Sequence, residues 1–150
     1  MSARKIVAVS GGFDPLHIGH VRMFEEAKKL GDELVVILNN DNWLISKKGF
    51  AFMPEHERKE VIEAIKHVDR VVVTDHALGN HSELDYRSVC RALREVKPHF
   101  FANGGDRKPD GDPVPEVLVC EELGIEMIYN LGRDGKVQSS SWLTERVKKK

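Results

Sequence analysis

The chain has 150 residues, of which 41% are hydrophobic and 31% are charged, and its formal net charge at pH 7 is −1. This length predicts one domain, residues 1–150, whose core buries roughly two thirds of the unfolded chain's surface. The near balance of charge argues against binding to nucleic acid through bulk charge. The sequence has neither a signal-peptide pattern nor an apolar run of about 18 residues, so we expect a cytoplasmic protein with no membrane partner.

Short β-branched runs alternate along the chain with amphipathic stretches at helical spacing. The predicted strands are residues 5–9, 33–39, 70–74, 99–103 and 126–130. The predicted helices are residues 17–30, 54–67, 86–96, 114–123 and 140–149. Repeated strand–helix units predict an α/β, Rossmann-like fold, with an open, mostly parallel five-stranded sheet and helices on both faces.

The stretch VSGGFDPLHIGH joins the first predicted strand to the first predicted helix. In an open parallel sheet such turns lie at the carboxyl edge of the strands, where ligands bind. A helix amino terminus there presents backbone N–H groups and a partial positive charge, which suit a phosphate. Gly11 and Gly12 place no side chain in the path of a ligand. Because His17 and His20 are three residues apart, both imidazoles point to the same side and can donate to the same phosphate.

Three further stretches follow predicted strands and reach the same edge. NDNWLISKKGFAFMP, predicted as an irregular loop, contains Lys47 and Lys48, and NGGDRKPDGDP contains Gly105 and Asp106. In GRDGKVQSSSWL, Arg133 lies on a loop, and serines precede the last predicted helix, whose N-cap they can form. Taken alone, these residues are also typical of solvated loop charges and of helix capping.

Two of these motifs, in this order, resemble the signatures of a known superfamily. GGFDPLHIGH is similar to the GxFDxxHxGH signature of the HIGH-motif nucleotidylyltransferases, and QSSSWL lies where that superfamily has a second, Ser/Thr-rich signature. The strongest resemblance is to the cytidylyltransferase-like branch, which includes glycerol-3-phosphate cytidylyltransferase and heptose 1-phosphate adenylyltransferase. Matches such as AKKLGDELVVILNND, KKGF and NGGDRKPD extend it over nearly the whole chain, whereas TDHALGNHSELDY matches neither relative.

The resemblance implies a reaction in which a phosphate oxygen of an acceptor attacks the α-phosphorus of a nucleoside triphosphate and pyrophosphate leaves. Because the attacking phosphate is already anionic, positioning and charge stabilisation supply most of the rate. CMP transfer from CTP to a polyol phosphate or sugar phosphate is the favoured form, and ATP with a sugar 1-phosphate is the alternative. The triphosphate would bring Mg²⁺, and the relatives imply a homodimer.

The resemblance also implies roles for single residues. The implied catalytic residues are His17, His20, Lys48 and Arg133. The implied nucleotide-binding residues are Gly11, Gly12, Phe13, Asp14, Gly19, Asn103, Gly105, Asp106, Ser139, Ser140 and Ser141. The implied acceptor contacts are Lys47, Arg58 and Lys66. In this scheme the histidines hold the charge that develops at the α-phosphate, and Lys48 closes over both substrates from a mobile loop. Asp14 orients the turn.

The same residues also allow other interpretations. The histidine pair can be half of a metal site, but no third ligand accompanies it at a suggestive spacing. Arg58 and Lys66 can simply pair with Glu55 and Glu63 on one helix. Class I aminoacyl-tRNA synthetases share the HIGH signature, but this chain has no room for an anticodon-binding domain. Phosphopantetheine and nicotinate-mononucleotide adenylyltransferases share GGFDP, and a non-catalytic nucleotide sensor on the same fold stays open.

Overall fold

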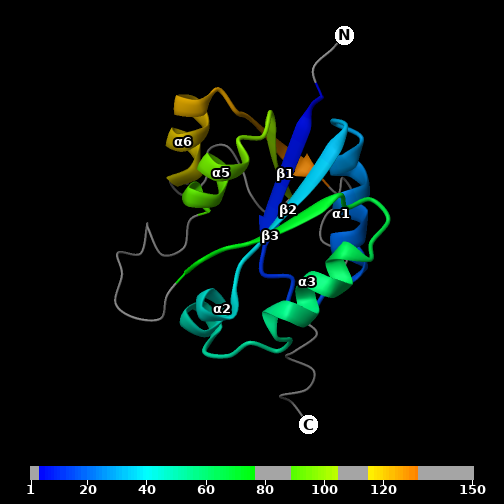
Figure 1. The fold of residues 1–150 in the computed structure, drawn as a ribbon, viewed down its shortest axis with the longest axis vertical. Helices are drawn as coiled ribbons and strands as arrows, with labels where there is room; N and C mark the ends of the chain where they lie inside the picture. Colours follow the sequence, from blue (N-terminus) through cyan, green and yellow to red (C-terminus); the bar gives the residue numbers. More distant parts are fainter. Residues whose placement is uncertain (1–3, 77–88, 105–114, 132–150) are drawn as a thin grey trace.

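A computed structural model of the protein describes residues 4–76, 89–104 and 115–131. Its five strands form one sheet in the order β3-β2-β1-β4-β5, and every neighbouring pair is parallel. The strands are β1 (Ile6–Gly11), β2 (Glu33–Leu38), β3 (Arg70–Val73), β4 (Phe100–Gly104) and β5 (Glu126–Leu131). All five predicted strands are therefore present, with ends that differ from the prediction by at most two residues. Figure 1 shows how the strands and helices are arranged.

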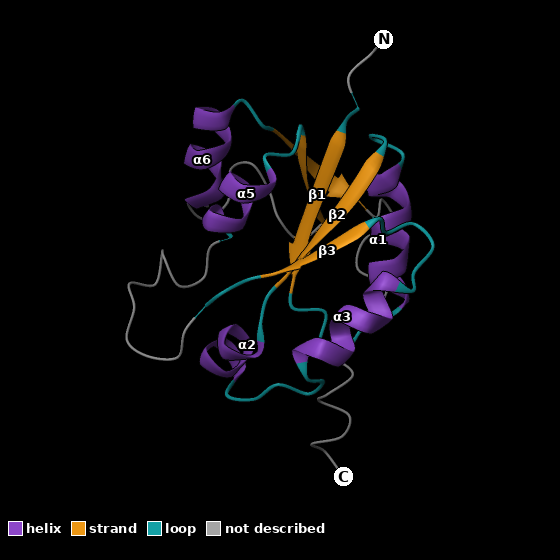
Figure 2. Ribbon diagram, in the orientation of Figure 1, coloured by secondary structure: helices purple, strands orange, loops and turns teal. Residues whose placement is uncertain are grey.

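Helices cover both faces of this sheet, as predicted. They are α1 (Ile18–Lys28), α2 (Asp41–Lys48), α3 (Glu55–Glu63), α5 (Cys90–Val96) and α6 (Pro115–Leu123). In Figure 2, α1 and α3 lie on one side of the strands and α5 and α6 on the other. These four helices fall within predicted helices, whereas the predicted last helix, 140–149, lies outside the described residues. The α/β, Rossmann-like prediction is confirmed.

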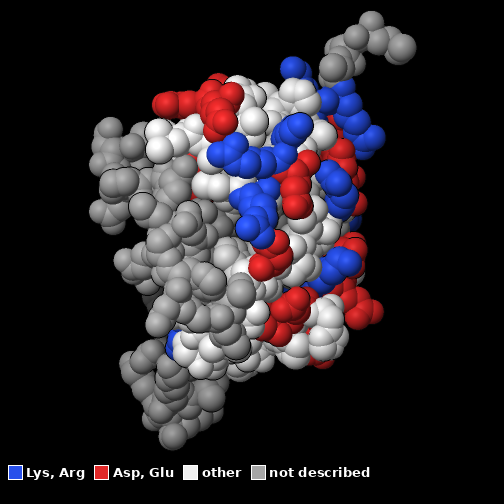
Figure 3. Space-filling model, turned by 60° about the vertical axis from the view of Figure 1, so that its left-hand side comes forward, with Lys and Arg blue, Asp and Glu red and all other residues white. Residues whose placement is uncertain are grey.

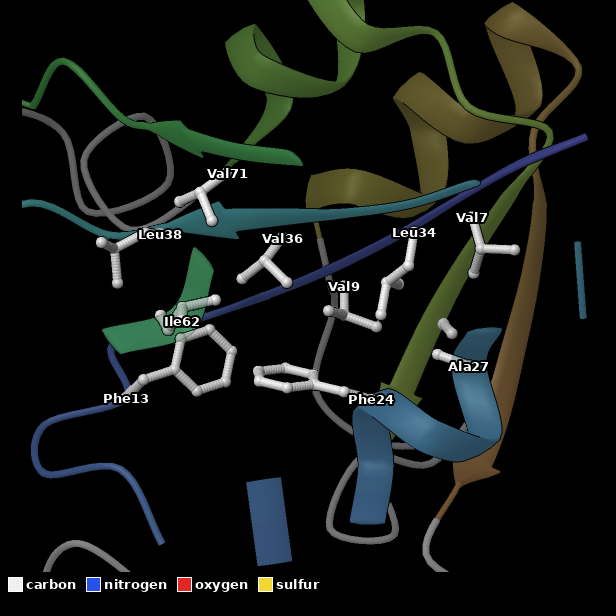
Figure 4. Close-up of a cluster of buried hydrophobic side chains, with 11 residues drawn as sticks. Val7, Val9, Phe13, Phe24, Ala27, Leu34, Val36, Leu38, Ile62 and Val71 are labelled. Carbon is white, nitrogen blue, oxygen red and sulfur yellow. The ribbon is translucent and has the colours of Figure 1, made fainter. Parts of the chain in front are cut away.

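Alternation along the strands divides the core into two clusters. Successive strand residues point to opposite faces, so Val7 and Val9 belong to one cluster and Ala8 to the other. The first cluster packs β1 and β2 against Phe24 of α1 and Ile62 of α3, both fully buried (Figure 4). The second packs the opposite face against α5 and α6. Because both faces are covered, the strands are almost continuously apolar, as in other parallel sheets.

The chain between β2 and α3 differs from the predicted irregular loop, because residues Asp41–Lys48 form α2. Asn40 caps this helix by accepting the N–H of Trp43 at 3.0 Å, and Gly49 ends it in the left-handed conformation at φ 90°. The side chain of Trp43 is buried, which anchors the helix. Lys48 therefore lies on the last turn of a capped helix rather than on a mobile loop.

The strand order places the β1–α1 turn at a topological switch point. From β1 the chain adds β2 and β3 on one side of the sheet, and later β4 and β5 on the other side. The carboxyl ends of β1 and β4, which are neighbours, flank the place where the order reverses. Ligands of open α/β sheets bind at this place, so the fold puts the predicted phosphate turn where a binding site is expected.

Candidate active site

The two histidines of the β1–α1 turn cap α1 together. His17 is the N-cap: its Nδ1 accepts the N–H of Gly19 at 3.1 Å, and Nδ1 of His20 accepts the N–H of His17 at 3.3 Å. The two rings stack with centroids 3.7 Å apart and planes inclined by 25°. Because both Nδ1 atoms accept backbone N–H groups, each neutral ring has its proton on Nε2. The turn therefore offers two Nε2–H donors.

His20 is neutral at physiological pH. Burial, the adjacent His17 ring and the charge of Lys48 together lower its pKa to about 3. The ring of Phe13 stands edge-on to His20, with centroids 4.8 Å apart and an interplanar angle of 89°. An imidazole in this setting donates a hydrogen bond without bringing a positive charge.

Phe13 itself belongs to the core. Its side chain is 4% exposed, and its ring lies 5.2 Å, centroid to centroid, from that of Phe24 (Figure 4). Its backbone is in the left-handed region at φ 50°, which is strained for a residue with a side chain. The ring packs edge-on against His20, and the prediction that Phe13 binds the nucleotide stays a prediction.

The glycines of the turn are packed closely against neighbouring side chains. A Cβ on Gly11 would lie 2.9 Å from the ring of Phe13, and one on Gly12 would lie 2.9 Å from the side chain of Leu44. The N–H of Gly19 is already bonded to His17. Gly11 and Gly12 are therefore both required for packing, and the prediction that they bind the nucleotide stays a prediction.

Asp14 ties the chain before α3 to the β1–α1 turn. Its side chain is 1% exposed, and its two carboxylate oxygens accept the N–H groups of Phe52 at 2.6 Å and Met53 at 2.5 Å. Hydrogen bonds to a buried carboxylate are strong. Through these contacts Asp14 fixes the turn to the chain before α3, and its predicted contact with the nucleotide stays a prediction.

Lys48 lies beside the histidine pair. Its Nζ donates to the backbone oxygen of Asp14 at 3.4 Å. Burial lowers the pKa of Lys48 and the Arg58 charge adds to this, while the Asp14 carboxylate opposes it. The charge of Lys48 also acts on His20, so the two groups are close. The structure therefore brings His17, His20 and Lys48 together, and Lys47 precedes Lys48 in α2.

The other two predicted acceptor contacts, Arg58 and Lys66, differ in burial and in position. Arg58 is fully buried and its guanidinium donates to four oxygen atoms of the protein, and its contact with the acceptor substrate stays a prediction. Lys66 is exposed in the turn between α3 and β3, near the amino ends of the strands. It is not brought together with the histidines.

The β4 side of the site is described only in part. Asn103, at the carboxyl end of β4, donates through Nδ2 to the backbone oxygens of Phe101 at 3.4 Å and Ile128 at 3.3 Å. It thereby joins β4 to β5 beside the register shift between Ala102 and Gly104. Several predicted residues, Gly105, Asp106, Arg133, Ser139, Ser140 and Ser141, lie outside the described residues, and their roles stay predictions.

Sequence reasoning missed the polar residues that follow β2. Asn39, 4% exposed, has an Oδ1 without a hydrogen-bond partner, and Asn40 caps α2 and donates through Nδ2 to the oxygen of His76 at 2.8 Å. Asp41 pairs with Arg58. The signal was available, because NND comes directly after a buried strand at the carboxyl edge of the sheet.

Metal-ligand clusters, membrane-spanning helices and surface charge bear on other partners. Among the described residues, no group of three or more His, Cys, Asp or Glu side chains could hold a metal ion. Within the same residues, none of the helices has the length and apolar character needed to span a bilayer. On the face shown in Figure 3, Lys and Arg are interspersed with Asp and Glu over the described surface.

A parallel Rossmann-like sheet whose switch point holds paired histidine donors and a lysine defines an enzyme of the nucleotidyltransferase class. Residues 8–131 match the family described as Cytidylyltransferase-like, and the chain belongs to this family. The resemblance that the HIGH-type motif indicated is thereby confirmed.

Comparison with known proteins gives relatives over most of the chain. An FAD synthase from Ferroglobus placidus is 34% identical over 145 residues, which are 96% of this chain and 88% of that protein. A bifunctional protein HldE from Desulfatibacillum aliphaticivorans is 34% identical over 131 residues, 86% of this chain and 23% of that protein. The crystal structure of a lipopolysaccharide core biosynthesis protein from Thermoplasma volcanium has a TM-score of 0.65 and 27% identity, covering 85% of this chain and 97% of that one.

Proposed function

We propose that this protein is an adenylyltransferase that transfers AMP from ATP to FMN and releases pyrophosphate. The observation that carries the proposal is the stacked pair His17 and His20, which presents two Nε2–H donors beside Lys48. The choice of substrates is supported by the relatives named FAD synthase, since FAD consists of FMN joined to AMP. It replaces the CMP transfer to a polyol phosphate that the sequence alone favoured.

The residues support this reaction through charge and position. The phosphate oxygen of FMN attacks the α-phosphorus of ATP, and the bond from that phosphorus to the oxygen of the leaving pyrophosphate breaks. No proton has to be removed from the attacking phosphate, so the site needs donors rather than a base. The two imidazoles donate to oxygens on which charge increases, each worth about 10²- to 10³-fold in rate. Lys48 supplies the positive charge that the neutral His20 imidazole lacks.

Mg²⁺ would arrive with the triphosphate rather than bind to the protein first. The side chains assembled here are nitrogen donors, and the buried Asp14 carboxylate already accepts two backbone N–H groups. Such a set does not fit a cation that prefers oxygen ligands, whereas the triphosphate does, and the ion would neutralise the departing pyrophosphate. Arg133 and the serines 139–141 are predicted to hold the same phosphates. A homodimer and a cytoplasmic location also stay predictions.

Two exposed apolar side chains favour a flat, apolar acceptor. Ile18, next to His17, is 52% exposed, and Phe52, whose N–H is bonded to Asp14, is 53% exposed. Both come from the segments that form the site. An aromatic ring system such as the isoalloxazine of FMN can cover such side chains, whereas a polyol phosphate gains nothing from them.

The test is a pyrophosphate-release assay that crosses ATP and CTP with FMN, glycerol 3-phosphate and a sugar 1-phosphate. We expect turnover with ATP and FMN, with FAD identified by its mass, and a loss of turnover in a folded His20→Ala variant. Turnover with CTP and glycerol 3-phosphate would instead establish cytidylyl transfer. Tight triphosphate binding without pyrophosphate release from any pair would identify a nucleotide sensor.

A second candidate is adenylyl transfer to a sugar 1-phosphate. It is supported by the similarity to the protein HldE over 86% of this chain and by the resemblance to heptose 1-phosphate adenylyltransferase. The same assay separates the two acceptors. A Phe52→Ser variant sharpens it, because this change should raise the KM for FMN and leave the KM for a sugar phosphate unchanged.

A further inference from the structure

Arg58 is a charged side chain with no exposed surface, and it lies beneath the candidate site. It extends from α3 into the space between the carboxyl ends of β1 and β2 and the start of α2. Its contacts are Nε to the oxygen of Met53 at 2.8 Å, Nη1 to the oxygens of Gly12 and Asn39 at 2.7 Å each, and Nη2 to Oδ1 of Asp41 at 2.6 Å. One guanidinium thus joins three separate segments of the chain, around residues 12, 39–41 and 53.

Only an arginine can make these contacts. Removing a charge from water costs several kcal/mol unless close partners compensate it, and the planar guanidinium offers five N–H donors in a fixed fork. A lysine has a single nitrogen and cannot reach four acceptors at once. A buried arginine with this many partners is therefore expected where the geometry of the acceptors, rather than net stability, is the requirement.

Two of the four acceptors bracket the segment that contains Lys48. Asp41 is the first residue of α2 and Met53 lies just before α3, so Arg58 holds both ends of residues 41–53. Asp14 fixes the second of these ends again through the N–H of Met53. The other acceptors, Gly12 and Asn39, are at the carboxyl ends of β1 and β2. The segment is thereby fastened to the sheet edge where the histidines lie.

We propose that Arg58 is a positioning residue for nucleotidyl transfer: by fastening both ends of segment 41–53 to the edge of the sheet, it holds Lys48 beside His20. Arg58 touches neither substrate in this scheme. The role in catalysis rests on the proposed function, since it acts through Lys48, whereas the fastening of the segment can be tested without any reaction. A misplacement of about 1 Å at a reacting group can cost 10²-fold in rate.

A double-mutant cycle tests whether Arg58 acts through Lys48. Arg58→Lys keeps the charge and removes most of the contacts. We expect it to lower kcat at least about 10-fold in the wild-type background, and less than about twofold when Lys48→Ala is already present, because coupled residues do not act additively. If the double variant is folded and its loss of kcat equals the product of the losses in the two single variants, the proposal is overturned.

Hydrogen exchange measured by mass spectrometry tests the same proposal without turnover. Arg58→Lys should accelerate amide exchange in residues 41–53 at least about 10-fold more than in the peptides of β1 and β2. Asp69→Asn is the matched control, because Asp69 accepts from Lys28 and from the N–H of Leu34 at the opposite edge of the sheet. It should leave the exchange of segment 41–53 unchanged.

If Arg58→Lys does not fold, Asp41→Asn replaces it, since this change removes only the Nη2 partner. The expected result has the same direction and a smaller size. Exchange that rises uniformly over the whole chain, or not at all in segment 41–53, would overturn the proposal whichever acceptor the enzyme uses. If the faster exchange is confined to segment 41–53 but the enzyme gives no turnover with ATP and FMN, only the proposed function is overturned.

Discussion

Charged side chains at the two ends of the strands differ in burial: those at the amino ends (the amino edge) are partly solvated, and those at the carboxyl ends (the carboxyl edge) are buried. At the amino edge, Lys28 pairs with Asp69, and both side chains are about one third exposed, at 32% and 34%. At the carboxyl edge, Asp14 and Arg58 are at most 1% exposed and are bonded to backbone groups of several segments. Ion pairs in water are worth about 0 to 1 kcal/mol, whereas buried charges are retained only with full partners. The carboxyl edge therefore uses charge to fix geometry.

The largest effect expected at the carboxyl edge is on turnover. His20→Ala should lower kcat about 10²- to 10³-fold, because it removes a preorganised donor to charge that increases in the transition state, while the KM for ATP changes much less. Steady-state kinetics with a thermal melt measures this. His67→Ala, which changes a histidine 4.0 Å from Glu25 outside the site, is the control. A folded His20→Ala enzyme with near wild-type turnover would show that the turn is only structural.

Asp14→Asn should be the most destabilising conservative change at the same edge. Both carboxylate oxygens accept backbone N–H groups, and an amide in their place turns an NH₂ group toward one of these donors. We expect the free energy of unfolding to fall by about 2 kcal/mol, seen as a lower urea midpoint with an unchanged slope. Asp69→Asn at the amino edge should cost less than about 1 kcal/mol, and equal losses at the two edges would contradict the comparison.

The pKa of His20 predicts how stability depends on pH. The folded value is lowered to about 3 from the ordinary 6.5, so between these values the unfolded chain binds a proton that the folded protein does not. Stability due to this residue is therefore complete above pH 6.5 and declines as the pH falls toward 3, by about 1.4 kcal/mol for each pH unit. Urea titrations of wild type and His20→Gln between pH 7 and 4 measure the difference. Parallel slopes in the two proteins would refute it.

The smallest expected effect is at the amino edge. Lys28→Ala removes the partner of Asp69 and a donor to the backbone oxygen of Asp32 at 2.8 Å. Because the pair is partly solvated, unfolding should become easier by less than about 1 kcal/mol. The difference between variant and wild type should shrink further in about 1 M NaCl, where charges are screened beyond roughly 3 Å. If the free energy of unfolding falls by several kcal/mol and the loss persists in salt, this pair behaves like the buried charges Asp14 and Arg58, which would contradict the comparison.

The sheet could be predicted from sequence because its strands are short apolar runs separated by amphipathic stretches. The exception is α2: its amphipathic pattern is weak, and what holds it is the Asn40 cap and the left-handed Gly49 at its ends. Its start is also fixed from outside by Arg58 through Asp41. Local patterns do not contain such long-range contacts, so an irregular loop was the natural prediction.

For the candidate site, the motif predicted which residues act, but it could not indicate their protonation or their hydrogen bonds. The spacing of His17 and His20 predicted that they lie together, whereas the neutral state of His20 depends on burial and on Lys48, which is far away in sequence. Arg58 was weighed as an acceptor contact or as a partner of Glu55, because spacing along a helix cannot show that a side chain turns into the protein. Only the structure shows that Arg58 donates to the backbone oxygens that follow β1 and β2, next to the candidate site.

The close approach between Gly11 and Phe13 restricts which sequences this fold can accept. Any side chain at position 11 would meet the Phe13 ring, since a Cβ there would be 2.9 Å away. A larger residue 11 therefore requires a smaller residue 13. A smaller side chain at position 13 would lose the edge-on contact that the Phe13 ring makes with His20. Mutations at positions 11 and 13 therefore affect the ionisation of His20. Gly11, Phe13 and His20 therefore depend on one another. A pair of changes at positions 11 and 13 that preserves the packing can still change the pKa of His20.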